Sequence, residues 1–152
     1  MKLRDSSGNE FRLVILRYQH PDLHEDQWDS NWLVVTGEVA ASSGERWRFS
    51  EPCVTTFELE NLAEWLDELA TDGRAPSDFA FTEPNLKFAY TPWPQGALQL
   101  TLSRESAPPT ATDVERQSGV TLEFRLSEGE PALLAMQIRS ALSDFPVRGG
   151  AA

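Results

Sequence analysis

The sequence is poor in the residues that most often carry chemistry, with one cysteine and two histidines among 152 residues. A single cysteine, Cys53, excludes an intramolecular disulfide and is typical of a reducing compartment. No run of about twenty apolar residues is present to span a membrane, and the opening MKLRDSSGNEF lacks the apolar stretch of a signal peptide. We therefore expect a cytoplasmic protein that does not associate with membranes.

Positive charge is also scarce. The chain has 13 basic and 24 acidic residues, which give a formal net charge of −11. Phosphate backbones repel such a surface, so we expect no direct binding to nucleic acid. An anionic surface is steered quickly onto a basic partner protein, but it also serves solubility alone. The composition by itself leaves both interpretations open.

The known catalytic motifs are missing as well. The sequence contains no glycine-rich phosphate loop, no GxSxG and no HExxH. Cys53 lies close to a predicted helix start, which would lower the pKa of its thiol. Its apolar neighbours Val54 and Phe57 favour the commoner role of a small, buried core residue. We predict a non-enzymatic protein without catalytic residues or a cofactor.

The two histidines are the basis of an alternative. His20 and His24 have the spacing of metal ligands on one face of a helix. Pro21 and the acidic residues around them indicate a solvated loop instead, so we expect no metal site. The alternative hypothesis is a small metal-dependent accessory protein or enzyme that uses these histidines. A further alternative is a structural subunit of an unrelated complex.

Length and strand patterning define the expected fold. A chain of this size matches one domain, so we expect a single domain over residues 1–152. β-Branched and aromatic segments predict strands at 11–18, 31–40, 45–50, 79–82, 85–91, 96–104 and 118–126. Because the strands come in runs that are each followed by one helix, we predict an α+β fold. It should have an antiparallel sheet of about six strands, with two main helices packed on one face.

Two segments have helical periodicity. Thr55 and Glu58 form a capping-box pattern at the start of a predicted helix over residues 55–71. Its apolar stripe consists of Leu59, Leu62, Ala63, Leu66, Leu69 and Ala70, with Trp65 at the rim. Ser127 and Glu130 form a second such pattern before a helix that should end at Pro146. Between the helices, the composition of residues 105–117 predicts an exposed, mobile loop. After the second helix, we expect residues 147–152 to form a frayed tail.

The first helix also carries the candidate binding residues. The candidates are Glu60, Glu64, Asp67 and Glu68. Glu60, Glu64 and Asp67 lie opposite the apolar stripe, and the helix contains no lysine or arginine. Like charges four residues apart cost roughly 0.2–0.5 kcal/mol per pair. This face is therefore either a solvated surface without a duty or an anionic docking face for a basic partner. Trp28 and Trp93, in polar or proline-flanked loops, are either core residues or interface anchors.

Several spaced blocks of the sequence resemble one known family. They are NWLVVTGEV at 31–39, W-x-F-x-EPC-x-TT-x-EL-x-x-LA-x-WL at 47–66, FTEPNLKF at 81–88 and DFP-x-R at 144–148. Together these blocks resemble the WapI-like immunity protein family. Members are thought to protect bacteria from polymorphic toxins by binding the toxin domain in the cytoplasm. The resemblance implies a small, non-enzymatic inhibitor without a cofactor, and it assigns no contact residues.

The family and the charge lead to the same expectation. The resemblance implies partners such as a cell-wall-associated toxin whose C-terminal domain cuts tRNA. A nuclease that grips RNA presents a basic cleft to the phosphates. An acidic domain can fill such a cleft, so we expect a basic toxin domain, such as a nuclease, as the partner.

Overall fold

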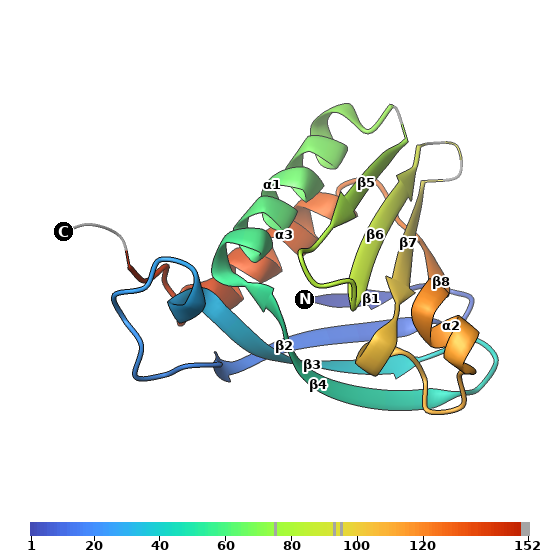
Figure 1. The fold of residues 1–152 in the computed structure, drawn as a ribbon. Coiled ribbons are helices and arrows are strands. Elements are labelled where there is room, and N and C mark those ends of the chain that lie inside the picture. The colour runs from blue at the N-terminus through green and yellow to red at the C-terminus, as the bar shows by residue number, and fades with distance from the viewer. Residues whose placement is uncertain (75, 93, 95, 150–152) are drawn as a thin grey trace.

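The computed structural model describes residues 1–74, 76–92, 94 and 96–149. Within these residues, eight strands form two four-stranded antiparallel sheets, and in each sheet the strands pair in chain order (Figure 1). The first sheet contains β1 (Lys2–Arg4), β2 (Glu10–Tyr18), β3 (Trp32–Ala40) and β4 (Arg46–Thr55). The second contains β5 (Ser77–Ala80), β6 (Leu86–Thr91), β7 (Ala97–Leu102) and β8 (Val120–Arg125).

The α+β class and the antiparallel pairing are confirmed, whereas the prediction of one sheet with about six strands is wrong. Helix α1 (Thr56–Asp72) separates β4 from β5, and β5 starts a new sheet instead of extending the first one. Alternating hydrophobicity identifies strands but does not say which strands pair. The additional strand β1 is only three residues long, which is too short for a period of two to be recognised.

The start of α1 is as predicted. The Thr55 hydroxyl accepts a hydrogen bond from the Glu58 backbone N–H at 3.2 Å, and the Glu58 carboxylate accepts one from the Thr55 N–H at 2.8 Å. The second carboxylate oxygen of Glu58 accepts from the backbone N–H of Thr82 at 2.6 Å, which ties the helix to the segment before β6. Trp65 is buried rather than at the rim, and its indole N–H donates to the Ser77 hydroxyl at 2.8 Å. Ala70 is exposed, so it does not belong to the buried stripe.

The last helix, α3 (Glu130–Leu142), begins and ends at points that differ from the prediction. The Ser127 N–H and hydroxyl both donate to the Glu130 carboxylate, at 2.9 and 3.0 Å. The helix itself starts only after Gly129, whose φ of 82° turns the chain. It ends at Leu142, before Pro146 is reached, so proline is not what stops it.

Residues 105–117 contain helical turns where the sequence predicts a loop. They include most of the 3-10 turn η2 (Arg104–Ser106) and most of the short helix α2 (Asp113–Ser118), so the two-helix prediction omits α2. Ser106 and Ala107 are buried, and the Trp47 indole N–H donates to the Ser106 carbonyl at 3.0 Å. This contact anchors the segment on β4. Mobility of residues 105–117 stays a prediction.

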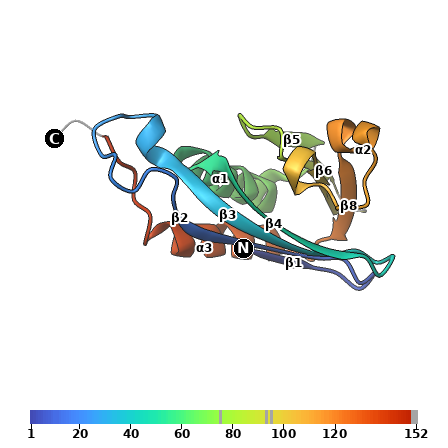
Figure 2. The same ribbon diagram turned by 60° about the horizontal axis from the view of Figure 1, so that its bottom comes forward.

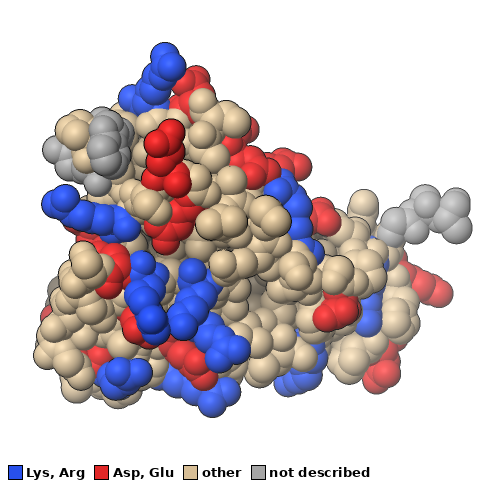
Figure 3. Space-filling view, turned by 180° about the vertical axis from the view of Figure 1, so that it is seen from behind, with Lys and Arg blue, Asp and Glu red and all other residues tan. Residues whose placement is uncertain are grey.

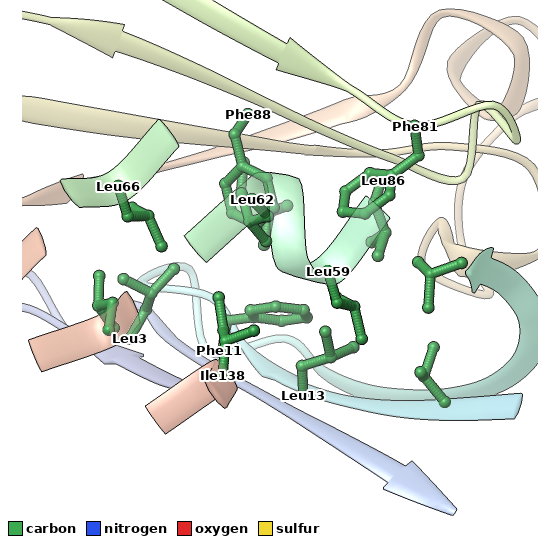
Figure 4. Close-up of a cluster of buried hydrophobic side chains, with 14 of the residues drawn as sticks. Leu3, Phe11, Leu13, Leu59, Leu62, Leu66, Phe81, Leu86, Phe88 and Ile138 are labelled. Carbon is green, nitrogen blue, oxygen red and sulfur yellow. The ribbon is translucent and has the colours of Figure 1, made fainter. Parts of the chain in front are cut away.

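One hydrophobic core joins the two sheets through the helices (Figures 1 and 2). Helices α1 and α3 pack against each other, and both also contribute to the core between the sheets. Figure 4 shows side chains from α1, α3 and both sheets converging, among them Leu59, Leu62, Leu66, Phe11, Leu13, Leu86, Phe88 and Ile138. Because α1 buries its leucines here, its acidic residues are left on the outer side.

Candidate functional site

The outward face of α1 is the most strongly anionic helical surface of the fold. At 100° per residue, its outward residues fall within about 100° of the helix circumference. They are Phe57, Glu60, Asn61, Glu64 and Glu68. The three glutamates are exposed, and among the described residues none of them has an ion-pair partner. These carboxylates are therefore available to charges from outside the molecule.

Asp67 differs from the other predicted acidic residues. Its carboxylate lies 2.6 Å from Nη2 of Arg139 on α3, and both side chains are about half exposed. The helix itself contains no cation, but α3 supplies one. No local pattern reveals this pairing, because the two residues are more than seventy positions apart in the chain. Asp67 is thus engaged within the protein, while Glu60, Glu64 and Glu68 are not.

The structure places Trp28 at the N-terminal end of this acidic face. Trp28 is 51% exposed, stacks on Phe57 with ring centroids 6.5 Å apart, and meets Trp32 edge-on at 6.2 Å. Phe57 and Glu64 share one side of α1 and are separated by about 10 Å along the axis. We name the surface formed by Trp28, Phe57, Glu60, Glu64 and Glu68 the α1 face. The other tryptophan candidate, Trp93, lies outside the described residues.

A groove of about 550 Å³ runs beside the α1 face, where the end of α3 and the following segment meet α1. Its walls combine two carboxylates and one guanidinium with apolar side chains: Glu60, Glu64, Arg139, Leu142, Ser143, Pro146 and Val147. The α1 face therefore combines charge, an exposed aromatic ring and an adjoining concave surface. Sequence analysis identified the charged residues but not the groove, which forms only when distant segments pack.

The outer face of the first sheet has the opposite character. It carries the basic residues Lys2, Arg4, Arg12, Arg46 and Arg48, together with the acids Glu10 and Glu38. Arg4 pairs with Glu10 at 2.8 Å, and Arg12 lies 3.6 Å from Glu38. In the view from behind, basic side chains gather at the lower left, with acidic ones among them (Figure 3). Alternation in RWRF (46–49) is the sequence signal that would have revealed this face.

The remaining chemical candidates have little means to react. Cys53 is buried, and this burial, reinforced by the charge of Glu51, raises the pKa of its thiol to about 12. The reactive thiolate is therefore scarce at neutral pH. Burial also raises the pKa of Glu51, with a further contribution from the negative charge of Glu105.

The histidine alternative receives no support from the geometry. His20 and His24 are both exposed on the loop after β2. Across the described parts of the chain, no three His, Cys, Asp or Glu side chains group as a metal site would require. The helices of these parts also include none that is long and apolar enough to cross a membrane.

These features define an α+β protein whose distinctive surface is an exposed, anionic helix face rather than a reactive cavity. The chain belongs to the immunity protein WapI-like family, whose model matches residues 2–146. The match extends over nearly the whole chain and confirms the resemblance of the spaced sequence blocks. A search of the curated proteins finds no match.

Proposed function

We propose that this chain is an immunity protein that binds the toxin domain of a cognate polymorphic toxin in the cytoplasm and neutralises it without catalysis. The observation that carries this proposal is the family match over residues 2–146. The buried Cys53, whose thiol pKa is raised by burial, is poorly suited to act as a nucleophile in a covalent mechanism.

The α1 face is the proposed contact surface. Glu60, Glu64 and Glu68 have no ion-pair partner among the described residues, so a basic toxin surface would find them available. Trp28 adds an exposed aromatic ring of the kind that commonly anchors an interface. A nuclease toxin fits this chemistry well, because its phosphate-binding cleft is basic.

Co-expression with a candidate toxin domain encoded in a neighbouring gene tests the proposal. The chain should restore growth and co-purify with the toxin domain as a 1:1 complex that weakens as salt rises. A variant with Glu60, Glu64 and Glu68 changed to Gln should rescue less well than one with Lys2, Arg46 and Arg48 changed to Gln. Cell death despite abundant, folded wild-type chain, with no complex recovered, would refute the proposal.

A further inference from the structure

The segment after α3 lies against the loop that carries Trp28. Figures 1 and 2 both show the red C-terminal segment beside the blue stretch between β2 and β3. We name residues 19–31 of this stretch the Trp28 loop; it ends in the single 3-10 turn η1 (Asp29–Asn31). Fixing such a loop in one conformation costs a large amount of conformational entropy. Contacts from other parts of the protein are therefore needed to hold it.

Arg148 supplies contacts of this kind to the first half of the loop. Its Nη1 lies 3.4, 3.0 and 3.2 Å from the carbonyl oxygens of His20, Pro21 and Leu23. A guanidinium carries several N–H donors in a fixed plane, so it can gather carbonyls that would otherwise face water. The loop backbone is thus wrapped around one side chain from a remote segment.

The same guanidinium is itself held in place. Its Cζ lies 3.4 Å from the centroid of the Tyr18 ring, and the Tyr18 hydroxyl donates to the Pro146 carbonyl. Burial raises the pKa of Tyr18 although the positive charge of Arg148 opposes this, so the phenol stays a donor at neutral pH. The end of β2, Pro146 and Arg148 therefore form one connected unit.

The second half of the loop is bound to the backbone of the same residue. The Arg148 N–H donates to Oδ1 of Asn31, and Nδ2 of Asn31 donates to the Arg148 carbonyl, both at 2.9 Å. Asn31 is fully buried, and its Nδ2 also donates to the Gln27 carbonyl beside Trp28. At Gly149 a Cβ would lie only 2.8 Å from the Asp26 carbonyl oxygen, so the segment passes tightly over the loop.

We propose that Arg148 is a positioning residue for partner binding, because it holds the Trp28 loop in the shape that presents Trp28 on Phe57. The proposal rests on the proposed function only for its binding half. The loop half concerns the free protein. A loop that reaches its binding shape a tenth of the time would weaken the apparent affinity about tenfold, without any contact from Arg148 to the partner.

Hydrogen exchange of the free protein tests the loop half. Arg148→Ala should speed exchange across the Trp28 loop about tenfold or more, while α1 and the second sheet keep their protection. Arg46→Ala, an exposed arginine of the outer sheet face, is the matched control and should change nothing in the loop. Arg148→Lys should fall between these variants, because a lysine keeps the charge but lacks the planar donors.

Two outcomes would overturn the loop half. Unchanged loop exchange would show that Arg148 does not hold it, and a rise across the whole protein would show a general structural role. If Arg148→Ala fails to fold, Arg148→Met replaces it, because it keeps the unbranched stem beside Tyr18 and removes the guanidinium contacts to the loop carbonyls. That variant should also speed loop exchange, and unchanged exchange there overturns the loop half equally.

Binding to the candidate toxin domain tests the other half. Arg148→Ala should raise the Kd about tenfold or more, whereas Arg46→Ala should leave it within about twofold. Faster loop exchange with an unchanged Kd would refute the positioning role, while the proposed function would survive. If the wild-type chain binds no toxin domain, the proposed function fails and takes the binding half with it, although the exchange result still decides the loop half.

Discussion

The α1 face and the outer face of the first sheet are both charged and exposed, yet their charges are arranged differently. On the sheet, Arg4 and Arg12 each have an acidic neighbour across the strands, at 2.8 and 3.6 Å. On α1, Glu60, Glu64 and Glu68 follow each other at intervals of four, with no cation between them. The sheet thus neutralises part of its own charge, whereas these three glutamates have no ion-pair partner among the described residues.

This difference separates a surface whose charges are partly paired from one whose charges repel one another. Each like-charge pair on α1 costs roughly 0.2–0.5 kcal/mol, so folding stability alone disfavours the arrangement. Charges that cost stability in the free protein can be stabilising in a complex with a basic partner. This contrast supports the proposal that the helix face recognises the partner, and the following predictions are designed to break or sharpen it.

The largest expected effect is on the rate of association. Changing Glu60, Glu64 and Glu68 together to Gln should slow association with the toxin domain about 10- to 1000-fold at low salt, because electrostatic steering is lost. The salt dependence of the rate should flatten at the same time. Stopped-flow mixing at several salt concentrations measures both quantities.

The matched control removes the same number of charges from the other face, by changing Lys2, Arg46 and Arg48 to Gln. That variant makes the protein more negative, so association should stay as fast or become faster. Equal slowing by both triple variants would show that the two faces do not differ in recognition, and the comparison would fail.

The next largest effect is expected at Trp28. Trp28→Ala should weaken binding by about 2 kcal/mol, roughly thirtyfold, mainly through faster dissociation, because buried tryptophans dominate many interfaces. Val114→Ala on α2 is the control, since Val114 is 74% exposed and lies away from the α1 face. Surface plasmon resonance measures the association and dissociation rates separately. A similar loss of affinity in both variants would show that Trp28 is not part of the contact.

Local patterns in the sequence predicted much of this surface. The capping box at Thr55 and Glu58 fixed where α1 starts, and the helical period placed Glu60 and Glu64 opposite the core. These features depend on residues only a few positions apart. Trp28 was identified as a candidate, but its stacking on Phe57 depends on how a loop folds back, which no local pattern encodes.

Most features that the sequence does not reveal depend on distant contacts. Arg139 meets Asp67 only because α3 packs on α1, and Arg148 reaches the Trp28 loop only across the assembled fold. The division into two sheets is of the same kind, since strand periodicity says nothing about pairing between runs. The short helix α2 is different, because a local signal for it exists in the capping box of Thr112 and Glu115. That signal is hidden in a segment rich in proline and threonine, which is typical of a loop.

A smaller effect distinguishes two acids within α1. Glu58→Ala should lower the free energy of unfolding by about 1–2 kcal/mol, because the Glu58 carboxylate accepts hydrogen bonds from Thr55 and Thr82. Glu60→Ala should leave stability within a few tenths of a kcal/mol or raise it slightly, since one repulsive pair disappears. Urea unfolding measures both. Equal losses of stability would mean that Glu60 also stabilises the fold, which would contradict the view that the acids of the α1 face serve binding rather than folding.

The smallest effect should be that of the ion pair between Asp67 and Arg139. Both side chains are about half exposed, so solvent screens their attraction and the coupling should be below about 1 kcal/mol. A double-mutant cycle with Asp67→Asn and Arg139→Gln, followed by urea unfolding, isolates this coupling from the effect of each single change. The same cycle applied to toxin binding sharpens the comparison further. Because Asp67 is already paired, its loss should slow association less than the loss of Glu64, and an equal or larger slowing would place Asp67 among the recognition residues.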